Sequence, residues 1–364
     1  MKLYRDQSFI RPDLQAHLYS DRLLGNVRAL RGLCRPETKF CAVVKANAYG
    51  HGIREIVNIL KSGPVDFFAV ATFYEALHIH PLIERQRILI LEPIHADQPP
   101  DQIRMCASAG FDCVLSSLEG LDLACRSLEG IKRPLRFHLN VETGMGRCGA
   151  DPHEASAILA RAANCKGLVH AGVFTHFATA DEEDLTYAFL QQERFEAFLD
   201  AHLLKGRSDL LIHACNSAAA IKMPGAHYDM VRCGISMYGY YSRRMMNPPV
   251  ELRPVLKLQA PITQIKRIPA GHPVSYGGSF VPKRETKAGI VPLGYADGYR
   301  RGFSNKAVMR HGKQFVPVIG RVCMDQLIVD LTDVPDAEAG QMVTVIDDAH
   351  DSPCGAYSLA DLAD

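Results

Sequence analysis

The sequence predicts a TIM-type (β/α)8 barrel in the N-terminal part of the chain and an all-β domain after it. Short runs rich in apolar and β-branched residues recur along the chain, segments with helix-like periodicity separate them, and the pattern changes after Tyr241. The runs cover residues 40–46, 67–72, 87–93, 112–117, 136–143, 167–176, 210–216 and 230–239.

These eight runs are expected to form parallel strands, because they are nearly continuous in apolar residues and so suit burial on both faces. The segments between them carry apolar residues at helical spacing, as at Phe189, Phe195 and Leu199 within residues 181–204. Eight strand and helix units in about 250 residues fit a closed barrel. An open, doubly wound sheet has the same element order and is the structural alternative.

The chain after Tyr241 is expected to form a second domain. Residues 242–254 are irregular, and β-type runs broken by Gly and Pro follow them. These runs cover residues 255–268, 289–293, 316–319, 326–331 and 342–346. We therefore expect a barrel domain over residues 1–245 and a β-domain over residues 246–364.

Composition and charge exclude several classes of function. The chain has 364 residues, and 41 Lys and Arg against 40 Asp and Glu leave a net charge of +1 without a dense basic block. Small molecules are therefore expected as partners, and nucleic acids and membranes are not. No apolar stretch approaches the roughly 18 residues of a membrane span. The start MKLYRDQSFIRPD lacks the apolar core of a secretory signal, so we expect a cytoplasmic protein.

The cysteines and the standard catalytic motifs narrow the choice further. The 11 cysteines are scattered without a CxxC pair, which indicates reduced thiols rather than a disulfide scaffold. The sequence contains no HExxH, GxxxxGK[ST], GxSxG or EF-hand motif. No metal site is expected, and zinc-protease, P-loop and hydrolase functions are disfavoured.

Lys45 lies at the end of the first run, and active sites of such barrels are built at the carboxyl ends of the strands. Burial there disfavours the ammonium form and lowers the pKa of the lysine. It thereby supplies the neutral amine that attacks an aldehyde to form a Schiff base. The alternative is an ordinary lysine that extends from the strand end to water.

Further polar residues follow the later runs. Arg147 lies in the segment TGMGRCG and suits a carboxylate or a phenolate, and His176 ends the sixth run, where a core histidine is the alternative. Ser217 follows the seventh run. With the backbone at Gly234 and Ile235 it could hold a phosphate where barrels often bind one, although an ordinary N-cap is the alternative for Ser217.

Arg232 is flanked by apolar residues within the eighth run. An arginine cannot lose its proton there and needs an acceptor, which the ring nitrogen of a cofactor would supply. In the second domain, the segments HPVSYGGSF, PLGYADGYRR and GRVCMDQ contain Tyr276, Tyr295 and Met324. Each segment alone could be a hairpin turn. Because all three occur in the same domain, a functional role for them is favoured.

Taken together, these motifs resemble the alanine racemase family of fold-type III enzymes, which use pyridoxal 5'-phosphate (PLP). The resemblance extends from Phe40 to Asp330 and is carried by AVVKANAYGHG, TGMGR, THFATADE, HACNSAA, RCGISMYG, VSYGG, GYADG and GRVCMDQ, in the family's order. It implies a cytoplasmic homodimeric isomerase that interconverts L-alanine and D-alanine. Its D-alanine would serve as a peptidoglycan precursor, with amino-acid catabolism as the alternative role.

The resemblance also implies a role for each candidate residue. Lys45 would carry PLP as a Schiff base, and Arg232 would face the pyridine nitrogen. Tyr276 would be the second base and would reach the active site from the other subunit, with His176 beside it. Further cofactor contacts would come from Tyr49, Asn216, Ser217, Gly234 and Ile235, and the substrate carboxylate would be bound by Arg147 and the backbone at Met324.

Racemisation itself favours two bases, because a proton leaves one face of Cα and another returns to the opposite face. Lys45 and Tyr276 would supply them. A tyrosine has an ordinary pKa of about 10, so neighbours such as Arg147 and His176 must lower it. An arginine at the pyridine nitrogen discourages protonation of the ring, which should suppress transamination.

The sequence departs from the family in two places. Asn140 stands where the family usually has a lysine that becomes carbamylated and orients the arginine of TGMGR, so Arg147 must be held in another way. The family also has a segment after ADLA that brings a tyrosine to the phosphate, and this sequence ends at Asp364, so that phosphate contact is expected to be missing or replaced.

Three alternatives remain at the level of sequence. A racemase that also accepts serine fits the same motifs. A fold-type III decarboxylase of basic amino acids would pair the pyridine nitrogen with a carboxylate, and Arg232 argues against it. A PLP-binding protein without catalysis would lack the β-domain that carries Tyr276.

Overall fold

The computed structural model describes residues 14–245 and 248–363. The chain forms two compact units. The first, here called the barrel unit, is Ser20–Leu252, and the second, the β unit, combines the chain up to Tyr19 with the chain from Arg253 onward. The boundary that the sequence suggests after residue 245 lies close to this division, and residue 246 itself is outside the described residues.

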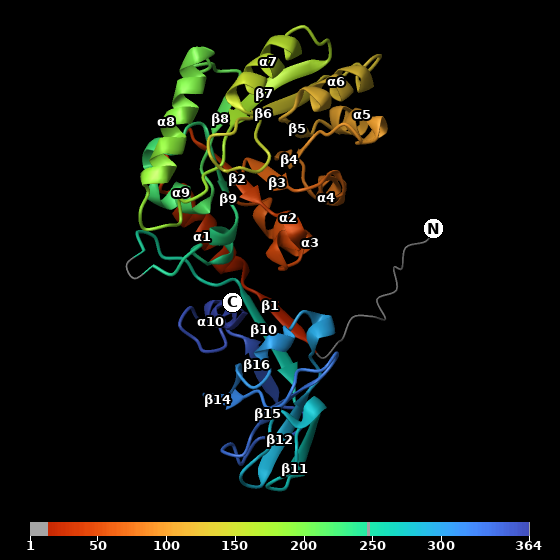
Figure 1. The fold of residues 1–364 in the computed structure, drawn as a ribbon, viewed down its shortest axis with the longest axis vertical. Helices are drawn as coiled ribbons and strands as arrows, with labels where there is room; N and C mark the ends of the chain where they lie inside the picture. Colours follow the sequence, from red (N-terminus) through yellow and green to blue (C-terminus); the bar gives the residue numbers. More distant parts are fainter. Residues whose placement is uncertain (1–13, 246–247, 364) are drawn as a thin grey trace. The chain divides into compact units, whose positions relative to one another are not determined.

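The barrel unit contains eight parallel strands joined in the order β8-β7-β6-β5-β4-β3-β2-β9 (Figure 1). The backbone N–H groups of Asp229 and Arg232 donate to the carbonyl oxygens of Ile212 (2.9 Å) and Cys215 (3.0 Å). These bonds connect β9 to β8 and close the ring, which confirms the predicted barrel. The strands are β2 (Lys39–Val43), β3 (Phe67–Val70), β4 (Arg87–Pro93), β5 (Asp112–Leu115), β6 (Leu135–Asn140), β7 (Leu168–Phe174), β8 (Leu211–His213) and β9 (Met230–Cys233).

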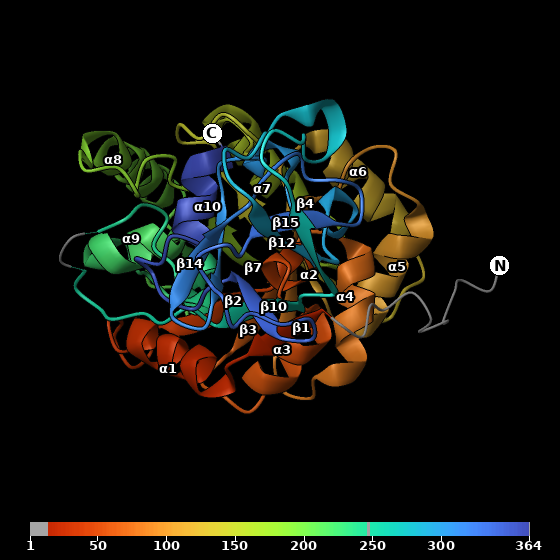
Figure 2. The same ribbon diagram turned by 90° about the horizontal axis from the view of Figure 1, so that it is seen from below.

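Helices surround the strands of the barrel unit, as Figure 2 shows. Several bury an apolar stripe. In α3, for example, Ile53, Ile56, Val57 and Leu60 are all buried. The helices are α1 (Ser20–Arg31), α3 (Ile53–Leu60), α4 (Phe73–Ile79), α5 (Pro100–Ala109), α6 (Leu118–Ser127), α7 (Pro152–Ala162), α8 (Thr186–Ala201) and α9 (Ser217–Lys222). No described helix is both long enough and apolar enough to cross a membrane.

The buried interior of the barrel has an apolar part and a polar part. The apolar part is a cluster formed by Cys41, Val43, Phe67, Ala69, Leu89, Val114, Phe174 and Met230. The polar part includes Asp112, His138, His213 and Arg232, each at most 4% exposed. Because a buried polar group is costly unless it is hydrogen-bonded, the polar part must be internally paired.

All eight predicted strands are present, but some end before the apolar runs do. The first run extends to residue 46, whereas β2 ends at Val43. The last run extends to residue 239, whereas β9 ends at Cys233 and a 3-10 turn, η4 (Ile235–Tyr238), follows. The runs continue because the loops beyond the strands are buried as well, as at Val44 and Tyr238.

The described part of the β unit contains two antiparallel sheets and one α-helix, which confirms the predicted all-β domain. The larger sheet has the order β1-β10-β16-β13-β14, and the smaller has the order β11-β12-β15. Val291, Met309, Val329, Val343 and Val345 are fully buried in its core. The elements are β1 (Gln15–Leu18), β10 (Leu256–Pro261), β11 (Gln264–Ile268), β12 (Thr286–Val291), β13 (Val308–His311), β14 (Gln314–Pro317), β15 (Leu327–Asp330), β16 (Met342–Ile346) and α10 (Ala356–Ala363).

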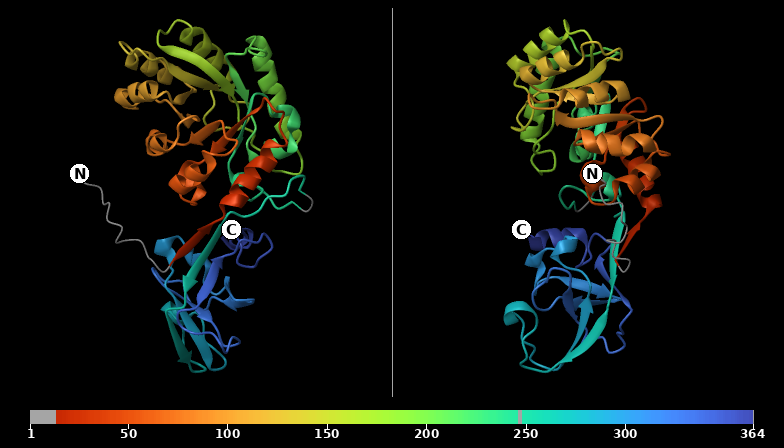
Figure 3. Two further views of the ribbon diagram at one scale, coloured as in Figure 1. Left: turned by 180° about the vertical axis from the view of Figure 1, so that it is seen from behind. Right: turned by 90° about the vertical axis from the view of Figure 1, so that its right-hand side faces the viewer.

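Strand β1 belongs to the β unit, although the sequence suggests a barrel domain that starts at residue 1. It pairs antiparallel with β10, with Gln15 opposite Gln259 and Leu18 opposite Leu256. Figure 3 shows β1, in red, beside the start of the C-terminal part of the chain. The strand has only four residues and three of them are exposed, so it lacks the apolar pattern that would reveal it.

One pair of cysteines is bonded, so the expectation that all are reduced thiols is wrong for this pair. Cys125 of α6 and Cys165, which follows α7, form a disulfide with their Cα atoms 5.9 Å apart. Helices α6 and α7 pack against each other and bring the two residues together. They are 40 residues apart, a spacing that carries no signal in the sequence.

The chain leaves β2 through a left-handed turn, α2 (Lys45–Tyr49). Ala46, Asn47, Ala48 and Tyr49 all have φ angles between 53° and 56°. This sense of winding costs about 1–2 kcal/mol for each residue with a β-carbon. Contacts around the turn must therefore hold it.

The carboxylate of Glu75 is one such contact. Its Oε1 atom accepts from the backbone N–H of Ala46 at 2.7 Å, and its Oε2 atom accepts from that of Ala71 at 2.7 Å. Glu75 also forms a reciprocal capping box with Thr72 at the start of α4. One side chain thus connects the Lys45 turn, the end of β3 and the start of α4.

Glu75→Ala should lower the free energy of unfolding by about 1–3 kcal/mol, because backbone N–H groups at Ala46, Ala71 and Thr72 lose their acceptor. Urea denaturation followed by circular dichroism measures this change. Glu84→Ala, at an exposed glutamate, is the control and should change stability by less than about 0.5 kcal/mol. Equal effects of the two substitutions would contradict the role of Glu75.

Candidate active site

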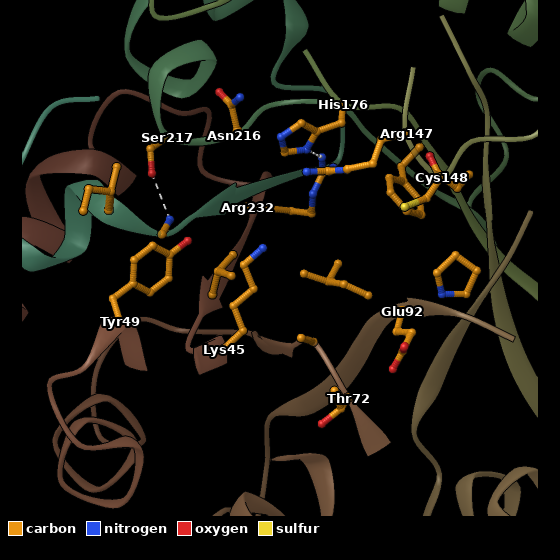
Figure 4. A pocket seen from close by; sticks show the side chains of 18 of the residues that line it. Lys45, Tyr49, Thr72, Glu92, Arg147, Cys148, His176, Asn216, Ser217 and Arg232 are labelled. Atoms are coloured by element: carbon orange, nitrogen blue, oxygen red, sulfur yellow. Dashed lines mark hydrogen bonds between the residues drawn. The ribbon is translucent and has the colours of Figure 1, made fainter. Parts of the chain in front are cut away.

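A cavity of about 510 Å³ opens at the carboxyl ends of the barrel strands (Figure 4). Its lining comes from the barrel unit and includes most of the residues that the sequence singles out. These are Lys45, Tyr49, Arg147, His176, Asn216, Ser217, Arg232, Gly234 and Ile235. The two other predicted residues, Tyr276 and Met324, belong to the β unit.

Lys45 enters the cavity directly after β2, as the sequence predicts. Burial lowers the pKa of Lys45, and the positive charge of Arg147 lowers it further, while Glu75 acts in the opposite direction. The lower pKa raises the fraction of neutral amine. The neutral amine is the form that attacks a carbonyl carbon or removes a proton.

Ser217, Gly234 and Tyr49 form a polar corner of the cavity. The hydroxyl of Ser217 accepts from the backbone N–H of Gly234 at 2.9 Å, drawn as a dashed line in Figure 4, and from that of Ser236 at 3.4 Å. The Tyr49 hydroxyl lies so close to Gly234 that a β-carbon there would overlap it. Hydroxyl and backbone N–H groups gathered in one place suit the oxygens of an anion.

Asn216, rather than Ser217, is the N-cap of α9. Its Oδ1 atom accepts from the backbone N–H of Ala219 at 3.0 Å, and its Nδ2 atom donates to the carbonyl oxygen of Phe177 at 3.2 Å. The N-cap alternative for Ser217 is therefore wrong. Because the amide of Asn216 takes the capping position, the Ser217 hydroxyl is left for the polar corner.

Arg232 is buried, and its guanidinium is hydrogen-bonded on several sides. The Nη2 atom donates to the carbonyl oxygens of Thr175 (2.9 Å) and Ala214 (3.1 Å), and Nη1 donates to Nδ1 of His213 (2.7 Å). Nη2 also lies 3.3 Å from Nδ1 of His176 (Figure 4). Burial lowers the pKa of Arg232 to about 10, so the group stays charged at neutral pH.

His176 is neutral in this environment. Burial, followed by the charges of Arg232, Arg147 and Lys45, lowers the pKa of His176 to about 3. Its Nδ1 atom faces the donor Arg232, so the single ring proton is on Nε2. His176 therefore offers a hydrogen-bond donor and no positive charge.

Arg147 extends from a loop that folds around Glu142. The carboxylate of Glu142 accepts from the backbone N–H groups of residues 144–147. Burial raises the pKa of Glu142, but these four bonds lower it below its ordinary value. The loop is thus held by Glu142, and Asn140, which replaces the family's usual lysine, lines the same cavity.

Tyr276 and Met324 lie on loops that meet within the β unit, and Tyr276 begins the 3-10 turn η5 (Tyr276–Gly278). The backbone N–H of Tyr295 donates to the carbonyl oxygen of Cys323 at 3.0 Å, and the Ser275 hydroxyl lies 3.5 Å from the Cys323 sulfur. Tyr276 is 71% exposed and Met324 is 58% exposed. The motifs VSYGG, GYADG and GRVCMDQ are therefore neighbours in space.

Sequence reasoning does not find every residue of the cavity. Thr72, Glu92 and Cys148 also line it. Thr72 and Glu92 lie at the carboxyl ends of β3 and β4, so an inspection of every strand end would have found them. His213 lies inside the barrel, and its signal is a polar residue within an apolar run.

Family models cover both units of the chain. The model described as alanine racemase, N-terminal domain, matches residues 19–242, and the one described as alanine racemase, C-terminal domain, matches residues 255–364. The chain is 37% identical to the alanine racemase of Carboxydothermus hydrogenoformans, over 95% of this chain and 93% of that protein. It is 34% identical to alanine racemase 1 of Caldanaerobacter subterraneus subsp. tengcongensis, over 97% and 90% of the two chains.

Solved structures agree with this match. The crystal structure of alanine racemase from D-cycloserine-producing Streptomyces lavendulae is similar with a TM-score of 0.89 and 31% identity, over 97% of this chain and 92% of that one. The alanine racemase of E. faecalis gives a TM-score of 0.88 and 30% identity, over 96% and 93%. The chain therefore belongs to the alanine racemase family, as its motifs indicate.

Proposed function

We propose that this isomerase interconverts L-alanine and D-alanine with PLP held in the barrel cavity, and that it works as a homodimer. One observation carries the proposal: a lysine with a lowered pKa, a buried arginine and a hydroxyl-lined corner share one cavity. The family match supports the reaction, and the cavity supports the cofactor. The product would supply D-alanine, a peptidoglycan precursor, in the cytoplasm.

The residues of the cavity fit PLP. The hydroxyls of Ser217 and Tyr49 and the backbone at Gly234 and Ile235 would hold the phosphate, because the missing β-carbon at Gly234 lets the Tyr49 hydroxyl lie beside the Ser217 hydroxyl's backbone partner. Lys45 would bind the aldehyde carbon of the cofactor as a Schiff base. Asn216 lines the cavity and would contact the cofactor.

Arg232 would face the pyridine nitrogen. A guanidinium donates a hydrogen bond to this nitrogen and so keeps it unprotonated. When bound, PLP draws electrons from the Cα atom of the attached amino acid and makes its Cα proton acidic. A decarboxylase of the same fold type would need a carboxylate at this place, so Arg232 favours the racemase.

Two side chains would move the proton at Cα. Lys45 would act on one face with the neutral amine that its lowered pKa favours. Tyr276, from the β unit of the partner subunit, would act on the other face. The N–H of His176 and the charge of Arg147 would both stabilise the phenolate of Tyr276. Racemisation follows because one side chain removes a proton from one face of Cα and the other delivers a different proton to the opposite face.

Arg147 and the backbone at Met324 would bind the substrate carboxylate. The guanidinium fork of an arginine matches the two oxygens of a carboxylate. The loop bonded to Glu142 fixes the backbone from which Arg147 extends. This loop would hold Arg147 in place without the family's usual lysine at position 140.

Borohydride reduction of the PLP-loaded protein should fix a covalent label on Lys45. Peptide mapping by mass spectrometry identifies the labelled lysine. Lys45→Ala should remove the label, whereas Lys166→Ala, at an exposed lysine, should retain it. In the protein without substitutions, a label on any other lysine would contradict the assignment of Lys45 as the lysine that binds PLP.

Mixed dimers test whether the active site is shared between subunits. Lys45→Ala and Tyr276→Phe protomers should each be inactive alone. After subunit exchange, half of the dimers are mixed and carry one intact site of two, so about one quarter of the normal activity should return. No recovery, despite demonstrated exchange, would show that each site is built within one chain.

A further inference from the structure

Four buried side chains form a line of polar groups through the barrel interior. Asp112 is the first residue of β5, His138 lies on β6, His213 ends β8 and Arg232 lies on β9. Arg232 lines the cavity, while the other three lie deeper in the barrel and are 0% exposed. Burying so many polar groups is costly unless every link between them is satisfied.

Hydrogen bonds join these four groups in order. Nη1 of Arg232 lies 2.7 Å from Nδ1 of His213, and Nε2 of His213 lies 2.8 Å from Nδ1 of His138. Nε2 of His138 lies 3.2 Å from Oδ2 of Asp112. Each imidazole therefore uses both ring nitrogens within the line.

One placement of protons satisfies every link when both rings are neutral. Arg232 can only donate, so Nδ1 of His213 accepts and the ring proton of His213 is on Nε2. That proton is donated to Nδ1 of His138, which leaves the proton of His138 on Nε2, facing Asp112. Starting from Asp112 gives the same result, because an ionised carboxylate can only accept.

Electrostatics and packing favour this arrangement at His213. Burial, and after it the charge of Arg232, lowers the pKa of His213 well below its ordinary value, so the ring is neutral. Phe174 stacks on the ring, with 4.8 Å between the centroids and 6° between the planes. The ring of His138 lies against Gly172 of β7, where a β-carbon would overlap it. Packing thus fixes the directions of both imidazoles, and burial keeps the His213 ring neutral.

Two arginines hold the far end of the line. Oδ1 of Asp112 accepts from Arg87 and from Arg136, and Oδ2 accepts from Arg87 and from His138. Burial raises the pKa of Asp112, but the bonds from His138 and Arg87 lower it below its ordinary value. Asp112 is therefore ionised, as the line requires.

We propose that Asp112 is a positioning residue for the active site, which acts through His138 and His213 to hold Arg232 as a fixed donor at the cavity. The inference rests on the proposed place of Arg232 at the pyridine nitrogen of PLP. A fixed donor keeps that nitrogen unprotonated. An arginine free to turn would not.

Asp112→Asn tests the line with little change in size. An amide has one oxygen and one NH2 group, and both carboxylate oxygens of Asp112 accept from an arginine. The NH2 group would therefore meet an arginine donor in either orientation. If it also faced His138, the protons would reverse along the line, and His213 would direct an N–H at the N–H of Arg232.

Long-range 1H–15N NMR of the histidine-labelled, PLP-loaded enzyme reads the proton positions directly. His138→Gln and His213→Gln assign the signals. Both rings should be neutral Nε2–H tautomers, and the His213 ring should not titrate between about pH 6 and about pH 9. Finding either ring charged, or as the Nδ1–H tautomer, would overturn the proposal, and this result needs no folded Asp112 variant.

In Asp112→Asn, kcat for alanine should fall about tenfold or more, KM should change less than about threefold, and the His213 signals should shift. His227→Gln is the matched control. His227 is a buried histidine of the same unit whose Nε2 lies 2.8 Å from the carbonyl oxygen of Ala220, outside the line. The control should leave kcat and the His213 signals unchanged. Unchanged kcat and His213 signals in Asp112→Asn would refute the proposal.

This proposal and the proposed function fail in different ways. If Lys45 does not hold PLP, borohydride leaves Lys45 unlabelled, while the two histidine tautomers stay as stated, since the line lies wholly within the protein. If Asp112 does not position Arg232, Lys45 is still labelled, and the tautomers or the response to Asp112→Asn differ from those expected.

Discussion

Arg232 carries a positive charge inside the barrel, and this buried charge requires hydrogen-bond acceptors around it. A buried charge is stable only where hydrogen-bond acceptors replace water. Two carbonyl oxygens, of Thr175 and Ala214, and two ring nitrogens, of His213 and His176, supply them. Burial is the largest cause of the lowered pKa of His176, and the charge of Arg232 is the next. One cation thus connects the packing of β7, β8 and β9 with the protonation states around the cavity.

The turn after β2 is a second constraint on the same cavity. Its four left-handed residues bring Lys45 and Tyr49 to one cavity, so the amine and the Tyr49 hydroxyl of the polar corner come from a single short segment. Strained backbone persists only where its surroundings over-determine it, and functional sites are where it collects. Glu75 ties this segment to β3 and α4. Glu75 therefore contributes both to the stability of the barrel and to the position of Lys45.

The sequence predicts the strands well, because strands buried on both faces are nearly continuous in apolar residues. It also predicts several residues that line the cavity at the strand ends, Lys45, His176 and Ser217 among them. The left-handed turn escapes prediction, since Ala46 and Ala48 carry no local signal for a positive φ. Pairings across the fold escape it too. The Ser217 hydroxyl accepts from the backbone N–H of Gly234, which lies 17 positions later in the chain. The arginines that bind Asp112 come from the two neighbouring strands.

Proton exchange at Cα tests the two-base account most directly. Tyr276→Phe enzyme, loaded with PLP, is mixed with L-alanine or D-alanine in deuterated water, and the first exchange step is followed in a single turnover. Tyr74→Phe, at a tyrosine of similar exposure (70% against 71%), is the control. If Tyr276 serves L-alanine and Lys45 serves D-alanine, exchange from L-alanine should fall about 10²- to 10⁴-fold and that from D-alanine far less. Equal losses from both enantiomers would contradict the account.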